Sequence, residues 1–154
     1  MIKTSKNGLT LVELLIVITI IGLLAGVFGI NVGKFRARAR DSQRSADIRT
    51  LQQGLAFYYY RSEYSGAYPI EDTYITGTDS LSQELRANGA LSAVPLDPIN
   101  QENYRYYYCS LQTNCSALGG NGTGRADGTS YILMYYMETG AVPGTVKGQN
   151  QATP

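Results

Sequence analysis

The sequence predicts an α+β protein in which a long N-terminal helix packs on a small head built around an antiparallel sheet. Three observations support this fold class. No proline occurs before Pro69, so nothing interrupts a helix over the first third of the chain. This first third of the chain begins with an apolar run and continues with the pattern of an amphipathic helix. The segments 104–111 and 131–137 are rich in tyrosine and bulky apolar residues, which is typical of strands.

The apolar run extends from Leu9 to Ile30, and Glu13 is its only charged residue. As a helix, these 22 residues span about 33 Å, which matches a bilayer core of about 30 Å. A secretory signal peptide fits poorly, because its apolar core is shorter and is followed by small residues at the cut site. Lys34 and Arg36 follow this run instead. We therefore expect a transmembrane and assembly helix over residues 9–33.

The residues around Glu13 resemble the N-terminal signal of type IV prepilins and pseudopilins. In the segment KNGLTLVELLIV, a basic leader ends in Gly8, an apolar residue and a threonine follow, and Glu13 precedes the uninterrupted apolar run. The resemblance implies that a prepilin peptidase cleaves between Gly8 and Leu9 and that the new Leu9 amino group is methylated. A buried carboxylate is costly without a partner. We therefore expect Glu13 to pair with the Leu9 amino group of a neighbouring copy in a filament.

The resemblance also sets the expected location and partners. Basic residues are more numerous after the apolar run than before it, which by the positive-inside rule alone would keep the head in the cytoplasm. The leader motif is more specific, and it implies a single-pass inner-membrane precursor with its head outside the cytoplasm. After assembly the product is an extracellular or periplasmic filament. The implied partners are other copies of the chain, the prepilin peptidase, an inner-membrane assembly platform and, before assembly, membrane lipid.

The stem is predicted as an amphipathic helix over residues 34–61 that continues the apolar helix. Its apolar residues recur at spacings of three and four: Ile48, Leu51, Leu55 and Tyr58. Arg44 falls on the polar side, where a weak pair with Asp41 is expected. Segment 34–61 carries a net charge of +5 and segment 62–154 one of −5. The arginines raise the alternative of a nucleic-acid surface, but two aspartates interrupt them and a solvated or lipid-facing helix is favoured, so no nucleic-acid partner is expected.

The head is predicted over residues 62–138. A short helix is expected at 79–88, with Ser80 as its N-cap and Gly89 as its stop signal. Residues 139–154 are rich in Gly, Thr, Gln and Pro and are predicted to form a disordered tail. The predicted organisation is a cleaved leader, an assembly helix, a stem, a head and a tail, at residues 1–8, 9–33, 34–61, 62–138 and 139–154.

Few residues carry chemistry. The chain has no histidine, which removes the usual general base and the commonest metal ligand, so neither an enzyme nor a cofactor is expected. Cys109 and Cys115 are the only cysteines, and a disulfide between them fits a head outside the cytoplasm. The nearby acids are scattered and lack the spacing of a calcium loop, so no metal site is predicted. These acids are Asp97, Asp127 and Glu138.

The expected function is that of a structural subunit of a type IV pilus or a pilus-like filament. One alternative is the major pseudopilin of a type II secretion system, a group known for a calcium site in its C-terminal loops. A DNA-uptake pilin has only the stem arginines in its favour. An alternative of another class is a monomeric membrane-anchored binding or sensor protein. The 13 tyrosines are expected to pack half-buried strands rather than to form an adhesive or conducting surface.

Overall fold

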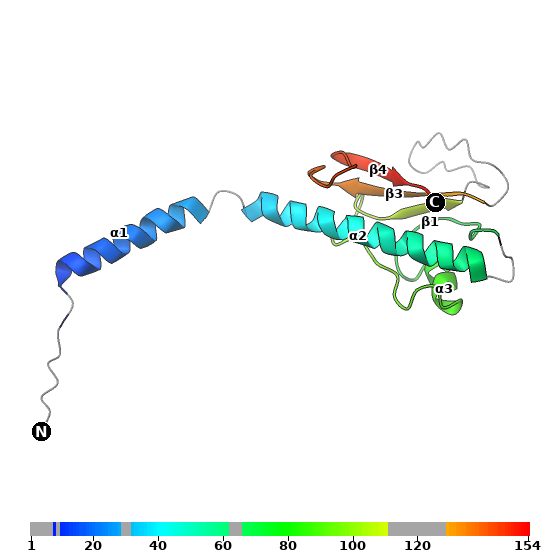
Figure 1. The fold of residues 1–154 in the computed structure, drawn as a ribbon, viewed down its shortest axis with the longest axis horizontal. Helices are drawn as coiled ribbons and strands as arrows, with labels where there is room; N and C mark the ends of the chain where they lie inside the picture. The colour runs from blue at the N-terminus through cyan, green and yellow to red at the C-terminus, as the bar shows by residue number, and fades with distance from the viewer. Residues whose placement is uncertain (1–7, 9, 29–31, 62–65, 111–128) are drawn as a thin grey trace, which may run out of the picture. The chain divides into compact units, whose positions relative to one another are not determined.

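The computed structural model of the chain describes residues 8, 10–28, 32–61, 66–110 and 129–154. The chain divides into two compact units, which we call unit 1 (residues 1–36) and unit 2 (residues 37–154). Helix α1 (Leu11–Phe28) belongs to unit 1, and α2 (Val32–Arg61) begins there and continues through unit 2 (Figure 1). The predicted continuity of the helix through residues 29–31 lies outside the described residues.

Helix α1 consists mostly of apolar residues, and Glu13 in its first turn is its charged residue. Within the part of the chain that the structure describes, no helix combines the length and apolar character needed to cross a membrane. The span predicted over residues 9–33 includes residues 9 and 29–31, which are not described. The span therefore stays a prediction.

Unit 2 contains a four-stranded antiparallel sheet whose strands follow one another in chain order. The strands are β1 (Asp72–Tyr74), β2 (Tyr107–Ser110), β3 (Tyr131–Met137) and β4 (Gly148–Ala152). Helix α2 runs along the sheet, as Figure 1 shows. The α+β arrangement predicted from the sequence is therefore confirmed. Strand β3 has the predicted bounds, and β2 lies within the segment predicted at 104–111, whose residue 111 lies outside the described residues.

The prediction of a disordered tail over residues 139–154 is wrong, because residues 148–152 form β4. This strand pairs with Leu133–Met137 of β3 along its whole length. Gly140 takes a positive φ of 62° in the turn that joins the two strands, and a side chain there would lie 2.5 Å from the backbone nitrogen of Lys147. The sequence of β4, GQNQA, has no strand pattern of its own. Pairing with a neighbouring strand, rather than local propensity, makes it a strand.

The core lies between the sheet, α2 and the short helix α3 (Ser80–Ala87). The apolar stem residues predicted to face inward are all buried, which confirms the periodicity argument. Gly54, on the buried side of α2, allows a close approach, because an added Cβ would lie 2.5 Å from Leu91 Cγ. The cluster joins α2, α3 and the inner sheet face through Ile48, Leu51, Leu55, Tyr58, Ile75, Leu81, Leu85, Val94, Tyr106, Tyr108, Tyr131 and Leu133.

Helix α3 lies within the predicted range 79–88, but its N-cap is one residue earlier than expected. Its N-cap is Asp79 rather than Ser80, and the Asp79 carboxylate accepts a hydrogen bond from the Ser82 amide at 2.9 Å. A carboxylate is a good N-cap, because it accepts hydrogen bonds from the free amides of the first turn and its negative charge is stabilised by the positive end of the helix dipole. Gly89 follows the helix with a φ of 68°, as predicted for a stop signal.

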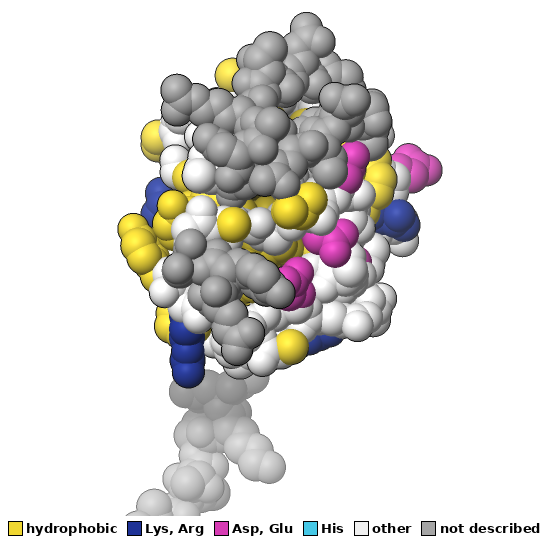
Figure 2. All heavy atoms as spheres, turned by 90° about the vertical axis from the view of Figure 1, so that its right-hand side faces the viewer, with side chains coloured by type: hydrophobic (Ala, Val, Ile, Leu, Met, Phe, Trp, Pro, Cys, Tyr) yellow, Lys and Arg dark blue, Asp and Glu magenta, His cyan; other side chains and the backbone are white. Residues whose placement is uncertain are grey.

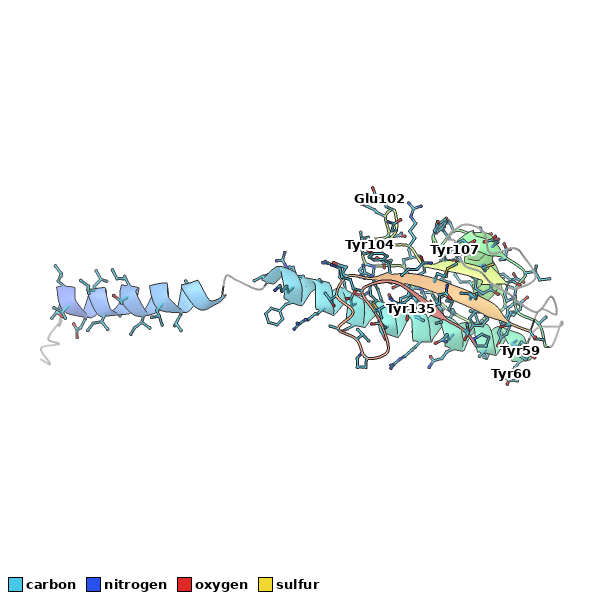
Figure 3. The ribbon with its side chains drawn as sticks, turned by 90° about the horizontal axis from the view of Figure 1, so that it is seen from above. Tyr59, Tyr60, Glu102, Tyr104, Tyr107 and Tyr135 are labelled. Atoms are coloured by element: carbon cyan, nitrogen blue, oxygen red, sulfur yellow. The ribbon has the colours of Figure 1, made fainter. Side chains whose placement is uncertain are left out.

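Several tyrosines contact one another near the C-terminal end of α2 and in the sheet. Tyr59 and Tyr60 lie at the C-terminal end of α2 (Figure 3), and Tyr59 contacts Tyr68 with ring centroids 4.8 Å apart. Tyr68 in turn contacts Tyr131 at 4.7 Å. Buried in β2, Tyr108 donates its hydroxyl proton to the Pro69 carbonyl at 2.7 Å. These contacts support a packing role, because the rings cover apolar area and, at Tyr108, the hydroxyl also has a hydrogen-bond partner.

Candidate assembly segment and buried ionic cluster

The N-terminal candidate residues surround the start of α1. Gly8 is exposed outside the helix, Leu9 lies outside the described residues, and Glu13 stands in the first turn. The Thr10 amide and hydroxyl both donate to Glu13 Oε2 at 2.8 Å, and the Glu13 amide donates to Thr10 Oγ1 at 3.3 Å. This reciprocal arrangement is a capping box, in which each side chain satisfies the other residue's backbone amide.

The capping box explains why α1 begins at Leu11, and it gives Glu13 a second role. The Thr-x-x-Glu spacing, which belongs to the leader motif, is also a known helix-start signal. Thr10 holds the Glu13 carboxylate at the positive end of the helix dipole. Its orientation is therefore set within one copy of the chain. The pairing of Glu13 with the Leu9 amino group of another copy stays a prediction.

A second group of charged residues, which we call the Arg44 cluster, lies where α2 contacts the head, with Asp41, Arg44 and Asp97 buried and Arg40 and Glu138 partly exposed. It consists of Arg40, Asp41, Arg44, Asp97 and Glu138. Arg44 is 0% exposed and donates to Asp97 through two nitrogens, at 2.6 and 3.2 Å. A third nitrogen donates to Asp41 at 2.9 Å and to Glu138 at 2.7 Å. The prediction that Arg44 lies on the polar side of the stem is therefore wrong.

Further hydrogen bonds fix the acids of the Arg44 cluster. Asp41 accepts from the amides of Glu138 and Thr139 at 2.8 Å each and from the Thr139 hydroxyl at 2.6 Å. Arg40 donates to both oxygens of Glu138. The Arg44 guanidinium lies over the Tyr104 ring, with its Cζ atom 4.9 Å from the ring centroid. Two cations and three anions thus satisfy one another, which is the condition for burying charge.

The electrostatics keep these groups charged. Burial alone would raise the pKa of the Asp41 carboxyl, but hydrogen bonds from Thr139, from the Glu138 amide and from Arg44 outweigh it and lower the pKa. The hydrogen bond from Arg40, and then that from Arg44, lowers the pKa of Glu138 despite partial burial. Burial of Arg44 opposes its charge, yet the bonds to Asp97 and Glu138 raise its pKa.

The Arg44 cluster bears on the acids that the sequence analysis considered for calcium. Asp97 and Glu138 do come together, but around the Arg44 guanidinium. Asp127 lies outside the described residues. Across the described ranges, no group of three or more His, Cys, Asp or Glu side chains is arranged to hold a metal ion. The arrangement ties α2 to the loop before β2 and to the end of β3, so its chemistry is structural.

Of the two cysteines, the structure describes Cys109 but not Cys115. Cys109 is buried in β2, and no cysteine is free within the described part of the chain. Cys115 lies outside the described residues, so the predicted disulfide stays a prediction.

Comparison with known proteins bears on the N-terminal part. Residues 3–29 match the family model of the prokaryotic N-terminal methylation motif. The chain is also similar to the type IV major pilin protein PilA of Myxococcus xanthus (strain DK1622), with 37% identity over 61 residues. That match covers 39% of this chain and 28% of the PilA length. No solved structure matches significantly. The resemblance to the type IV pilin family that the residues around Glu13 indicated is thus confirmed.

Proposed function

We propose that this chain is the precursor of a structural subunit of a type IV pilus or a pilus-like filament, polymerising through its N-terminal helix. The observation that carries the proposal is the N-terminal segment. It matches the methylation motif over residues 3–29 and presents Gly8, a capped Glu13 and the apolar α1 in that order. Comparison with a curated major pilin supports the same function.

The proposed assembly step uses the new N-terminus. Cleavage after Gly8 by a prepilin peptidase creates a Leu9 amino group four residues before Glu13 in the chain, and this amine is then methylated. The Thr10 cap already holds the Glu13 carboxylate in one orientation at the end of an apolar helix. When apolar helices bundle in a filament, the amine of a neighbouring copy neutralises the carboxylate, and the pair fixes the axial register between copies.

The head supports a pilus over the pseudopilus of a type II secretion system. In the latter group a calcium site in the C-terminal loops is expected, whereas here the Asp97 and Glu138 carboxylates accept hydrogen bonds from Arg44. The proposed location is an inner-membrane precursor with its head outside the cytoplasm and then an extracellular filament, built with an inner-membrane assembly platform. A disulfide between Cys109 and Cys115 suits that location.

N-terminal mass analysis of sheared filaments tests the proposal. We expect a chain that begins at Leu9 with a methylated amine. Gly8→Ala should leave the uncleaved precursor in the membrane, while Gly33→Ala, at an exposed helical position with open space around it, is the matched control and should be processed normally. A wild-type chain that keeps Met1 and is never recovered in sheared material would contradict the proposal and favour a monomeric membrane-anchored protein.

A further inference from the structure

A hollow of about 490 Å³ opens on unit 2 near the beginning of its part of α2. Arg38 and Ser42 line it from α2, and Ala141, Val142 and Pro143 line it from the turn between β3 and β4. Arg38 is exposed, and the ion pairs of the described residues use Arg40 and Arg44 but not Arg38. The hollow therefore offers one unpaired positive charge beside an apolar wall.

The other end of unit 2 carries the complementary chemistry. Ile70 is 60% exposed and is followed by Glu71, which is half-buried, and Asp72, which is exposed. Ile70 lies near Tyr58, because both line one shallow hollow at the end of α2. Figure 2 views this end of the molecule and shows acidic side chains beside hydrophobic ones. The apolar side chain of Ile70 and the negative charges of Glu71 and Asp72 are therefore complementary to the apolar residues and the positive charge that line the Arg38 hollow.

We propose that the segment Ile70–Asp72 of one copy docks into the Arg38 hollow of the next copy. Ile70 would cover Val142 and Pro143, and Asp72, on the same side of the extended segment, would face Arg38, while Glu71 adds negative charge nearby. This inference rests on the proposed function and names the contact through which heads join in the filament.

Geometry makes the contact intermolecular and open-ended. Tyr58, which marks the acidic end, lies 20 residues after Arg38 on one helix, roughly 30 Å at about 1.5 Å per residue. Since a single copy cannot bring its two ends together, the acidic end must find the hollow of another copy. A head-to-tail contact between different surfaces does not close on itself in pairs, and it propagates into a filament when its rotation does not form a ring.

A second copy fits the hollow better than an anionic lipid surface or a nucleic acid does. Those ligands are bound by rows of cations, whereas this hollow presents one cation and an apolar wall. The two proposed contact segments also carry opposite charge, Arg38 on one side and Glu71 and Asp72 on the other, which favours a head-to-tail approach of two copies.

Charge reversal in the full chain tests the docking. Arg38→Glu, and separately Glu71→Arg with Asp72→Arg, should each reduce sheared filament by about fivefold or more, because a surface pair is lost and like charges meet. Combining all three substitutions restores complementarity at every contact and should recover most of the yield. Arg86→Glu, an exposed reversal on α3, is the control and should assemble like wild type.

A crosslinking experiment gives an independent readout. In filaments of a Ser42→Cys, Asp72→Cys chain, a short bis-maleimide should produce a ladder of covalent multimers, while either single variant should give none. If wild type forms no filament, the proposed function fails. If all variants assemble equally and no ladder forms, only the docking inference fails. A loss with Arg38→Glu that the acidic reversal neither reproduces nor rescues would overturn it in favour of lipid or nucleic acid at the hollow.

Discussion

Replacing Arg44 with alanine should destabilise the head more than any exposed charge change on the same helix. Arg44 is 0% exposed and donates four hydrogen bonds to three carboxylates. Removing one partner of a buried ion pair typically costs about 3–5 kcal/mol, because the remaining charge is left buried. The remaining acids keep other donors, such as the Ile99 amide to Asp97 and Arg40 to Glu138. We therefore expect the lower end of that range, about 3 kcal/mol.

The measurement is urea or thermal unfolding of the solubilised full chain, followed by a signal from the tyrosine-rich head. A domain of about 120 residues shifts by about 4 °C per kcal/mol, so the midpoint should fall by about 12 °C. Arg49→Ala, exposed one and a half turns further along α2, is the control and should change the free energy of unfolding by less than about 0.5 kcal/mol.

A double-mutant cycle separates the ion pair from lost packing. Asp97→Asn should itself be destabilising, and the double variant with Arg44→Ala should cost less than the sum of the two, because the substitutions remove a shared interaction. Additive losses, or an Arg44→Ala variant within about 1 kcal/mol of wild type, would refute the idea that the Arg44 cluster holds the head on the stem.

Three further predictions concern pH, assembly and the cysteines. Folding lowers the pKa values of Asp41 and Glu138, so their charged forms stabilise the folded state above the ordinary carboxyl range, and this stabilisation is lost as the pH falls through that range. The thermal unfolding midpoint should therefore drop below about pH 4. An unfolding midpoint that stays constant between about pH 3 and pH 7 would contradict this. Glu13→Gln keeps the helix-capping spacing but removes the charge, whereas Glu13→Ala removes both. Both should insert into membranes and give few filaments, and normal filament yield from Glu13→Gln would exclude the pairing with an amine. Intact mass before and after reduction should show Cys109 joined to Cys115, and two thiols that alkylate without reduction would disprove the bridge.

The sequence by itself determined the features that depend on neighbours in the chain. The apolar run, the Gly8 to Glu13 spacing and the inward face of the stem each arise within a few helical turns, where side chains three and four residues apart share a face. Gly89 stopped α3 as expected, because a left-handed residue is a local requirement. The bounds of β3 followed from seven consecutive bulky residues.

Only the tertiary structure decided the Arg44 cluster and strand β4. Asp97 and Glu138 lie 53 and 94 residues from Arg44 in the chain, so no local sequence pattern predicts that the three residues meet. An isolated arginine on a helix is usually exposed to solvent, which is why the sequence favoured that position for Arg44. The residues of β4 are polar and become a strand because β3 offers an unpaired edge. In both cases the stabilising partner is brought close by the folded chain, and the free energy of the contact exists only after the intervening segments are in place.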